Sequence, residues 1–162
     1  MTIKSPISLK NQDNILPIDL SKINRIAVVG TLVKQLKIDN KSLWSVLKKA
    51  VNTEAELIFA AGHLDTNEVN ETVMNEAQRA ASIADLVVIF VGYLDEKKRL
   101  EAVKLPMPQN VLVDVVSQVE GNLVVVVLGN EDLKMPWEKG VKGILRVDEV
   151  SEGLVDFIFE NS

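Results

Sequence analysis

The chain of 162 residues contains no cysteine and a single histidine, His63. The absence of thiols excludes a cysteine nucleophile, a redox dithiol, a disulfide framework and any zinc site built on cysteine. A lone imidazole has no partner ligands in the sequence, so we expect no bound metal. The function has to be sought among carboxylates, amides and the loops that present them.

The chain also lacks an excess of positive charge, because 18 basic residues face 23 acidic ones and the net charge is -5. Such a chain has little electrostatic attraction for phosphate backbones or anionic lipid, and we expect neither nucleic acid nor a membrane as a partner. No apolar run approaches the roughly 20 residues of a membrane span, and the first ten residues lack the apolar core of a signal peptide. We therefore favour a cytoplasmic location.

The chain does contain short β-branched runs that end in glycine, which is typical of strands buried on both faces of a sheet. Strands are expected at residues 25–30, 55–60, 85–92, 123–129 and 143–147. Amphipathic segments with helical spacing lie between or after them, at residues 43–50, 69–84, 108–119 and from 151 onward. This alternation predicts an α/β protein, a three-layer αβα sandwich around a mainly parallel, doubly wound sheet of about five or six strands.

The length suits one compact domain. The polar first part of the chain contains Pro6 and Pro17 and one short apolar stretch. We interpret residues 1–24 as a linker arm packed on the domain, and residues 25–162 as the α/β sandwich domain.

Ligands of open α/β sheets bind beyond the carboxyl ends of the strands, so the loops that follow the predicted strands are the places to search. The loop after Gly30 lacks the further glycines of a dinucleotide fingerprint and the Gly-Lys-Ser/Thr ending of a P-loop. We expect no cofactor.

Three features of other loops carry functional alternatives. His63 follows the second predicted strand and is either a surface or capping histidine or a substrate contact. Trp137 either packs against the sheet or stacks on a sugar. Residues 93–105 are expected to form a long, charge-rich loop without secondary structure, which is either a functional loop or simply a solvated one.

Several short segments together resemble a known domain. They are residues 7–11 with 15–18, 25–30, 59–62, 84–92, 105–109 and 135–137. In this order they are similar to the Leu-Leu-Lys-Asn and Leu-Leu-Pro-Leu, Ile-Ala-Val-Ile-Gly, Tyr-Ala-x-Gly, Ala-Asp-Val-Val-Ile-Val-Val-Gly, Leu-Pro-Gly-x-Gln and Leu-Pro-Trp segments of one family. The chain thus resembles the C-terminal α/β sandwich domain of family 3 glycoside hydrolases, the β-glucosidase group.

The resemblance implies a site. The family carries a Glu-Gly-x-Asp-Arg motif ten residues before the proline of its Leu-Pro pair, and in many members the glutamate is the catalytic acid/base. Counting back from Pro106 reaches Glu96, which is the candidate acid/base here. The weaker candidates for substrate-side contacts are Asp95, His63 and Trp137.

The motif is incomplete, because Lys97, Arg99 and Leu100 replace its glycine, aspartate and arginine. A retaining glycosidase also needs two carboxyl groups about 5 to 5.5 Å apart. In the family, the nucleophilic aspartate lies in a Ser-Asp-x motif on a preceding (β/α)8 barrel. The resemblance therefore implies a barrel domain of the same parent protein as the partner, a β-linked sugar as the substrate, and an isolated chain that is inactive.

Two further hypotheses stay open. The sandwich is a structural or regulatory domain that docks to the barrel without touching the sugar, or it is a free-standing flavodoxin-like binder of a small molecule. The fold favours the second of these, although no phosphate-binding loop supports it.

Overall fold

The apolar runs form the inner strands of a six-stranded sheet in the computed structural model, which describes residues 6–159. The strands lie in the order β1-β8-β7-β6-β2-β5, and all neighbours are parallel except β1, which runs antiparallel to β8. Their bounds are Ile7–Asn11 for β1, Arg25–Val29 for β2, Glu56–Ala60 for β5, Leu86–Gly92 for β6, Leu123–Leu128 for β7 and Gly143–Val147 for β8. A separate hairpin joins β3, Lys37–Ile38, to β4, Lys41–Ser42.

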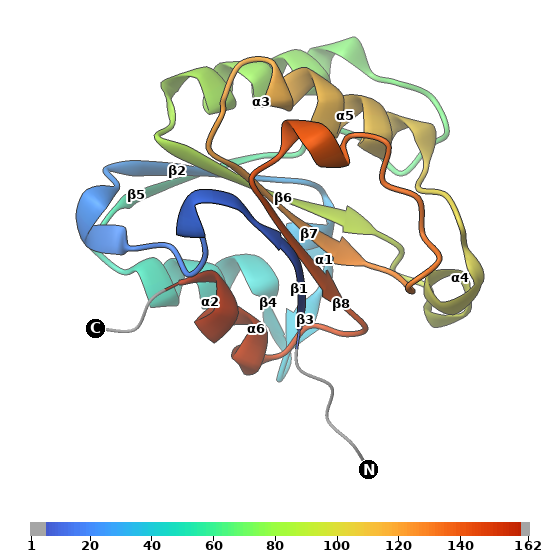
Figure 1. Cartoon of the computed structure of the whole chain (residues 1–162), viewed down its shortest axis with the longest axis horizontal. Helices are drawn as coiled ribbons and strands as arrows, with labels where there is room; N and C mark the ends of the chain where they lie inside the picture. The colour runs from blue at the N-terminus through green and yellow to red at the C-terminus, as the bar shows by residue number, and fades with distance from the viewer. Residues whose placement is uncertain (1–5, 160–162) are drawn as a thin grey trace.

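Helices cover both faces of this sheet (Figure 1). The helices α3 and α5 lie on one face, and α1, α2 and α6 lie on the other. Their bounds are Leu32–Gln35 for α1, Leu43–Val51 for α2, Glu71–Ile83 for α3, Met107–Ser117 for α5 and Glu152–Ile158 for α6. A short helix α4, Glu96–Glu101, lies beyond the carboxyl end of β6. Three 3-10 turns lie at Gln12–Asn14, Leu20–Lys22 and Glu138–Gly140.

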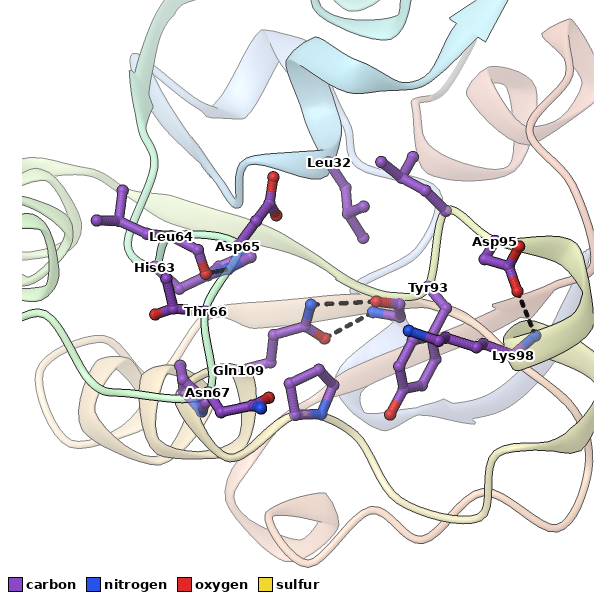
Figure 2. A pocket seen from close by; sticks show the side chains of 14 residues that line it. Leu32, His63, Leu64, Asp65, Thr66, Asn67, Tyr93, Asp95, Lys98 and Gln109 are labelled. Carbon is purple, nitrogen blue, oxygen red and sulfur yellow. Dashed lines mark hydrogen bonds between the residues drawn. The ribbon is translucent and has the colours of Figure 1, made fainter.

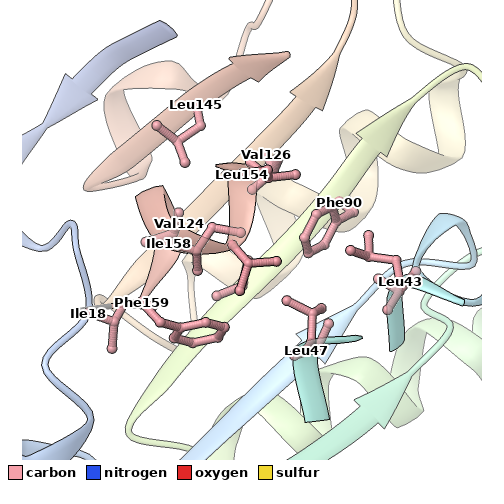
Figure 3. Packing of buried hydrophobic residues seen from close by; sticks show 14 of the residues in the cluster. Ile18, Leu43, Leu47, Phe90, Val124, Val126, Leu145, Leu154, Ile158 and Phe159 are labelled. Carbon is pink, nitrogen blue, oxygen red and sulfur yellow. The ribbon is translucent and has the colours of Figure 1, made fainter. Parts of the chain in front are cut away.

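The hydrophobic core has two parts, one on each side of the sheet. Figure 3 shows the part beneath α2 and α6, where Leu47 and Ile158 lie on the same side of the sheet as Phe90. The part beneath α3 and α5 contains small residues such as Ala77 and Ala81, which let α3 approach the sheet closely. Every residue of β6 and β7 is buried, because these strands are paired on both edges and covered by helices on both faces.

The predicted three-layer sandwich with a mainly parallel sheet is confirmed, and the five predicted strands are all present. The expectation that residues 93–105 lack secondary structure is wrong, because α4 lies within them. In the segment expected as an arm, β1 pairs with β8 and Ile18 forms an isolated bridge to Phe159. The described part of that segment therefore makes sheet contacts of its own.

Gly92 is the position where the fold tolerates a side chain least. It has φ +130°, a conformation that L residues rarely adopt, and an added Cβ would collide with the backbone oxygen of Leu128 in β7. We expect Gly92→Ala to lower the free energy of unfolding by about 3 kcal/mol or more. Urea denaturation followed by circular dichroism measures this change.

Gly121 provides the matched control, because nothing lies within 4 Å of its added Cβ and it has no positive φ. Gly121→Ala should leave stability unchanged or raise it by less than about 1 kcal/mol. Equal stability of the two variants would contradict the close packing of β6 against β7 at this point.

Candidate functional site

A cavity of about 450 Å³ opens beyond the carboxyl ends of β5 and β6, beside the start of α1 (Figure 2). In the sheet, β5 lies next to β2 at one edge, whereas β7 and β8 continue from β6 toward the opposite edge. The strand order therefore reverses between β2 and β6, and the cavity lies at this point. Its lining residues are Leu32, His63, Leu64, Asp65, Thr66, Asn67, Gly92, Tyr93, Leu94, Asp95, Lys98, Pro106, Pro108 and Gln109. This is the position in an α/β sheet where ligands usually bind.

The floor of the cavity is fixed by Gln109, a buried polar residue of α5 that is 5% exposed. Its side-chain oxygen accepts a hydrogen bond from the Gly92 backbone N–H at 2.8 Å, and its amide nitrogen donates to the Gly92 carbonyl at 3.1 Å. Figure 2 shows both bonds. Since the pairing of β2 with β6 ends at Val29 and Ile89, these Gly92 groups have passed the end of β2, and Gln109 takes the place of a neighbouring strand.

His63 lies on one wall and is 2% exposed. Its Nε2 is 3.3 Å from the Thr31 hydroxyl, and its Nδ1 is 3.3 Å from the backbone oxygen of Leu64. Burial lowers the pKa of the imidazole, while the Leu64 carbonyl and the Asp65 carboxylate act in the opposite direction. The neutral imidazole of His63 can therefore hold the loop after β5 in place through these hydrogen bonds, or it can contact a ligand in the cavity.

Two carboxylates line the cavity from opposite sides. Asp65 is exposed and accepts a hydrogen bond from the Gln35 side chain at 2.7 Å. Asp95 is the N-cap of α4, where one of its oxygens accepts a hydrogen bond from the Lys98 backbone N–H at 3.0 Å. Both side chains thus present acceptor oxygens to the cavity, with Lys98 as a nearby cation.

Glu96 follows Asp95 in the first turn of α4 and is exposed. It does not belong to the cavity lining, although Asp95, directly before it, and Lys98, two residues after it, do. Glu96 thus lies at the rim of the cavity and not in its wall. A group on the rim can act on a ligand only if another surface brings that ligand to it.

The position of α4 is fixed by backbone carbonyls rather than by apolar packing. The Arg99 guanidinium donates to the carbonyl oxygens of Tyr93, Leu94 and Asp148, at 3.1, 3.1 and 2.6 Å. The side-chain amide of Asn130 donates to the carbonyls of Arg99 and Ala102, at 3.1 and 2.8 Å. These bonds connect α4 to the loops that follow β6, β7 and β8.

Trp137 lies away from this cavity. It is 5% exposed and packs in the part of the core beneath α5, and its indole N–H donates to the Asn110 side-chain oxygen at 2.9 Å. It borders a separate hollow of about 230 Å³ on that side. The structure therefore brings His63 and Asp95 to one cavity, places Glu96 at its rim and locates Trp137 elsewhere.

Sequence reasoning missed the contacts that shape the site, namely those of Gln109, Arg99 and Asn130. One local signal could have revealed α4, because an aspartate such as Asp95 before a run of helix-forming residues is a typical N-cap. Among residues 6–159, no group of three or more His, Cys, Asp or Glu side chains could hold a metal ion. In the same range, no helix is long and apolar enough to cross a membrane.

In a comparison with protein families, the glycosyl hydrolase family 3 C-terminal domain matches residues 7–151 of this chain. A thermostable β-glucosidase B of Acetivibrio thermocellus is 32% identical over 158 residues, which are 88% of this chain and 21% of that protein. A β-glucosidase of Bacteroides ovatus is 26% identical over 164 residues, or 85% of this chain and 22% of that protein.

Solved structures agree in fold. A family 3 β-glucosidase of Bifidobacterium adolescentis matches with a TM-score of 0.77 and 25% identity, over 95% of this chain and 25% of that one. A β-glucosidase of Listeria innocua in complex with isofagomine matches with a TM-score of 0.68 and 18% identity, over 93% of this chain and 22% of that one. The chain thus spans about a fifth to a quarter of the length of these relatives.

The buried imidazole makes stability depend on pH. Because the pKa of His63 is lower in the folded than in the unfolded chain, the unfolded state binds the proton first as the pH falls below 6.5. The free energy of unfolding should therefore decrease from pH 6.5 downward, until the folded imidazole is protonated too. Urea denaturation at a series of pH values between about 8 and 5 measures the slope.

His63→Gln serves as the comparison, since the carboxylates titrate in both proteins and cancel in the difference. The variant should lose the part of the slope that begins near pH 6.5. Parallel stability curves for the two proteins would contradict a buried, neutral His63.

Proposed function

Because the chain belongs to glycosyl hydrolase family 3 as a C-terminal domain, we propose that it completes the sugar site of a β-glucosidase-related enzyme. The other part of that site would be a (β/α)8 barrel in the same parent protein. The observation that carries this proposal is the cavity at the carboxyl edge of the sheet, which has carboxylates in its wall and a further carboxylate at its rim. The substrate would be a β-linked sugar, whose hydroxyl groups match the acceptor oxygens of Asp65 and Asp95.

Exposed apolar side chains support docking of a second domain at this edge. Leu64 and Leu94, which line the cavity, are 40% and 45% exposed, and Leu100 on α4 is 60% exposed. Val103 and Met107, in the stretch that joins α4 to α5, are 48% and 56% exposed. Apolar groups clustered around a polar cavity are typical of a surface that another domain covers.

The proposed role of Glu96 is that of the acid/base. Retaining hydrolysis needs a nucleophile and an acid on opposite sides of the glycosidic bond, and the nucleophile would come from the barrel. A general acid must keep its proton near neutral pH, which usually requires burial. Since Glu96 is exposed, the docked barrel would have to supply that burial.

A second function, structural docking without sugar contact, is favoured by one observation. Arg99, at the position of the family's motif aspartate, is engaged with three backbone carbonyls and so serves to hold α4 in place. In that case α4 would act as a rigid docking element, and the exposed Asp95 would contact the barrel, while the buried His63 would hold its loop in place. The two functions differ in what happens when Glu96 loses its charge.

The isolated chain should fold and yet not hydrolyse nitrophenyl β-glucosides. The reason is that the nucleophilic carboxylate of a retaining mechanism would lie on the barrel, and one carboxyl group cannot perform both steps. Circular dichroism and a chromogenic assay on the same purified fractions check both points. Turnover that follows the protein peak through further purification would contradict the proposal.

In the full-length protein, Glu96→Gln should slow glycosylation by cellobiose about 100- to 10,000-fold, because a poor leaving group needs a proton. The first step with a dinitrophenyl glucoside should barely change, since its phenolate leaves unaided. The second step should slow and then recover with azide, a nucleophile that needs no base. Pre-steady-state kinetics with both substrates separates these steps.

Glu101→Gln is the matched control, because Glu101 is an exposed glutamate at the other end of the same helix. It should leave both substrates unaffected. If Glu96→Gln does the same, the carboxyl group is not catalytic and the structural function is the better account. Equal losses on both substrates in the first step would indicate misfolding or lost binding.

A further inference from the structure

The charges of this acidic chain are unevenly distributed along the sequence. Residues 34–49 contain five lysines and one acidic residue, although the net charge of the whole chain is -5. Residues 147–159 contain four acidic residues and no basic one. We call the first set the basic half, Lys34, Lys37, Lys41, Lys48 and Lys49, and the second set the acidic half, Asp148, Glu149, Glu152 and Asp156.

Both halves border the same face of the sheet. Leu43 and Leu47 of α2 and Leu154 of α6 belong to one part of the core, and Figure 3 shows them around Phe90. Figure 1 shows the two helices on the same side, with α2 beneath the β2–β5 end of the sheet. This α2–α6 face therefore carries Lys48 and Lys49 on α2 and Glu152 and Asp156 on α6, and the other members of each half lie in the segments that precede these helices.

Two cations of the basic half, those of Lys34 and Lys48, lie over aromatic rings instead of carboxylates. The Lys34 ammonium is 4.2 Å from the centre of the Phe59 ring, and the Lys48 ammonium is 5.9 Å from that of Trp44. The two rings pack edge to face at 5.5 Å and are both half-buried. Within residues 6–159, none of the five lysines forms an ion pair. Their charge is thus available to an external partner.

The acidic half combines exposed carboxylates with an exposed aromatic ring, that of Phe157. Glu149 and Glu152 are exposed and form no ion pair within the described range. Phe157 lies on the outer side of α6 and is 40% exposed. The half-buried Trp44 on α2 and the exposed Phe157 on α6 provide each half with an aromatic group next to its charges.

We propose that the α2–α6 face is a self-association surface, on which two copies of this chain meet around a two-fold axis. In such an isologous contact the basic half of each copy faces the acidic half of the other, so that the same complementary contact forms twice. Phe157 of one copy would approach Trp44 and Lys48 of the other. A polyanion would pair with the basic half alone and be repelled by the acidic half, which is why a second copy fits better.

Concentration-dependent sedimentation tests this inference on the purified chain. At about 20 mM salt the chain should form a reversible dimer as its concentration rises to about 1 mM. Raising the salt to about 500 mM shortens the screening length from about 20 Å to about 4 Å, so the dissociation constant should rise about tenfold or more. A chain that stays monomeric at 1 mM in low salt would overturn the proposal.

Charge reversal identifies the surface. Lys48→Glu with Lys49→Glu should give a monomer, since the reversed positions on α2 then oppose Glu149 and Glu152 of the other copy. Glu149→Lys with Glu152→Lys should do the same, because the reversed positions then oppose Lys48 and Lys49. An equimolar mixture of the two variants should form a one-to-one heterodimer, because both contacts become complementary again. Heterodimer formation is a result that general electrostatic repulsion between the copies does not produce.

The control variant, Lys134→Glu with Lys139→Glu, makes the same change in net charge in the segment between β7 and β8, away from α2 and α6. It should dimerise like the original chain, apart from a small effect of net charge. If this control also dissociates the dimer, or if the mixture of reversed variants stays monomeric, the α2–α6 face is not the interface. Circular dichroism of each variant ensures that a folded chain is compared.

Discussion

The buried backbone at the end of β6 sets the geometry of everything around the cavity. The N–H and C=O groups of Gly92 lie beyond the end of β2, in a strand whose every residue is buried, and buried backbone groups without partners cost about 1 to 3 kcal/mol each. The side-chain amide of Gln109 satisfies both groups. For this the first turn of α5 has to lie against β6, and the chain between them has to loop outward, where it forms α4 and the rim of the cavity.

Local sequence patterns were sufficient to predict the sheet but not the segments whose stability comes from distant contacts. Strands such as β6 and β7 are continuous apolar runs, and such a run alone predicts a strand that is buried on both faces. The edge strand β1 is short and mostly exposed, and nothing but its pairing with β8 identifies it. The helix α4 has no buried residue and is held by Arg99 and by Asn130, whose side chain reaches it from a loop about thirty residues further along. Such pairings depend on the tertiary structure.

The same distinction holds for the candidate site. The loop that carries His63 could be assigned to the ligand-binding edge in advance, because parallel strands bring their carboxyl ends to one edge, but the burial of its imidazole could not. The position of Glu96 followed from the resemblance alone, whereas its place at the rim depends on the cap that Asp95 forms. For Trp137 the sequence left packing and stacking on a sugar open, and it could not show that the ring is buried and that its indole N–H donates to Asn110, a contact between residues 27 positions apart.

The two proposed contact surfaces differ in position and in chemistry, and the difference in chemistry allows salt to distinguish association at one from association at the other. The carboxyl edge presents apolar side chains around a polar cavity, so association there would depend on apolar burial and change little with salt. The α2–α6 face presents separated charges, and association there would weaken as salt rises. Because the basic half of each copy faces the acidic half of the other, and the two halves are separated across the strands, the two-fold axis would lie in the interface and run along the strands. The strands of the two copies would then run in the same direction, so both carboxyl edges would lie at one end of the dimer, where two docked barrels would be neighbours.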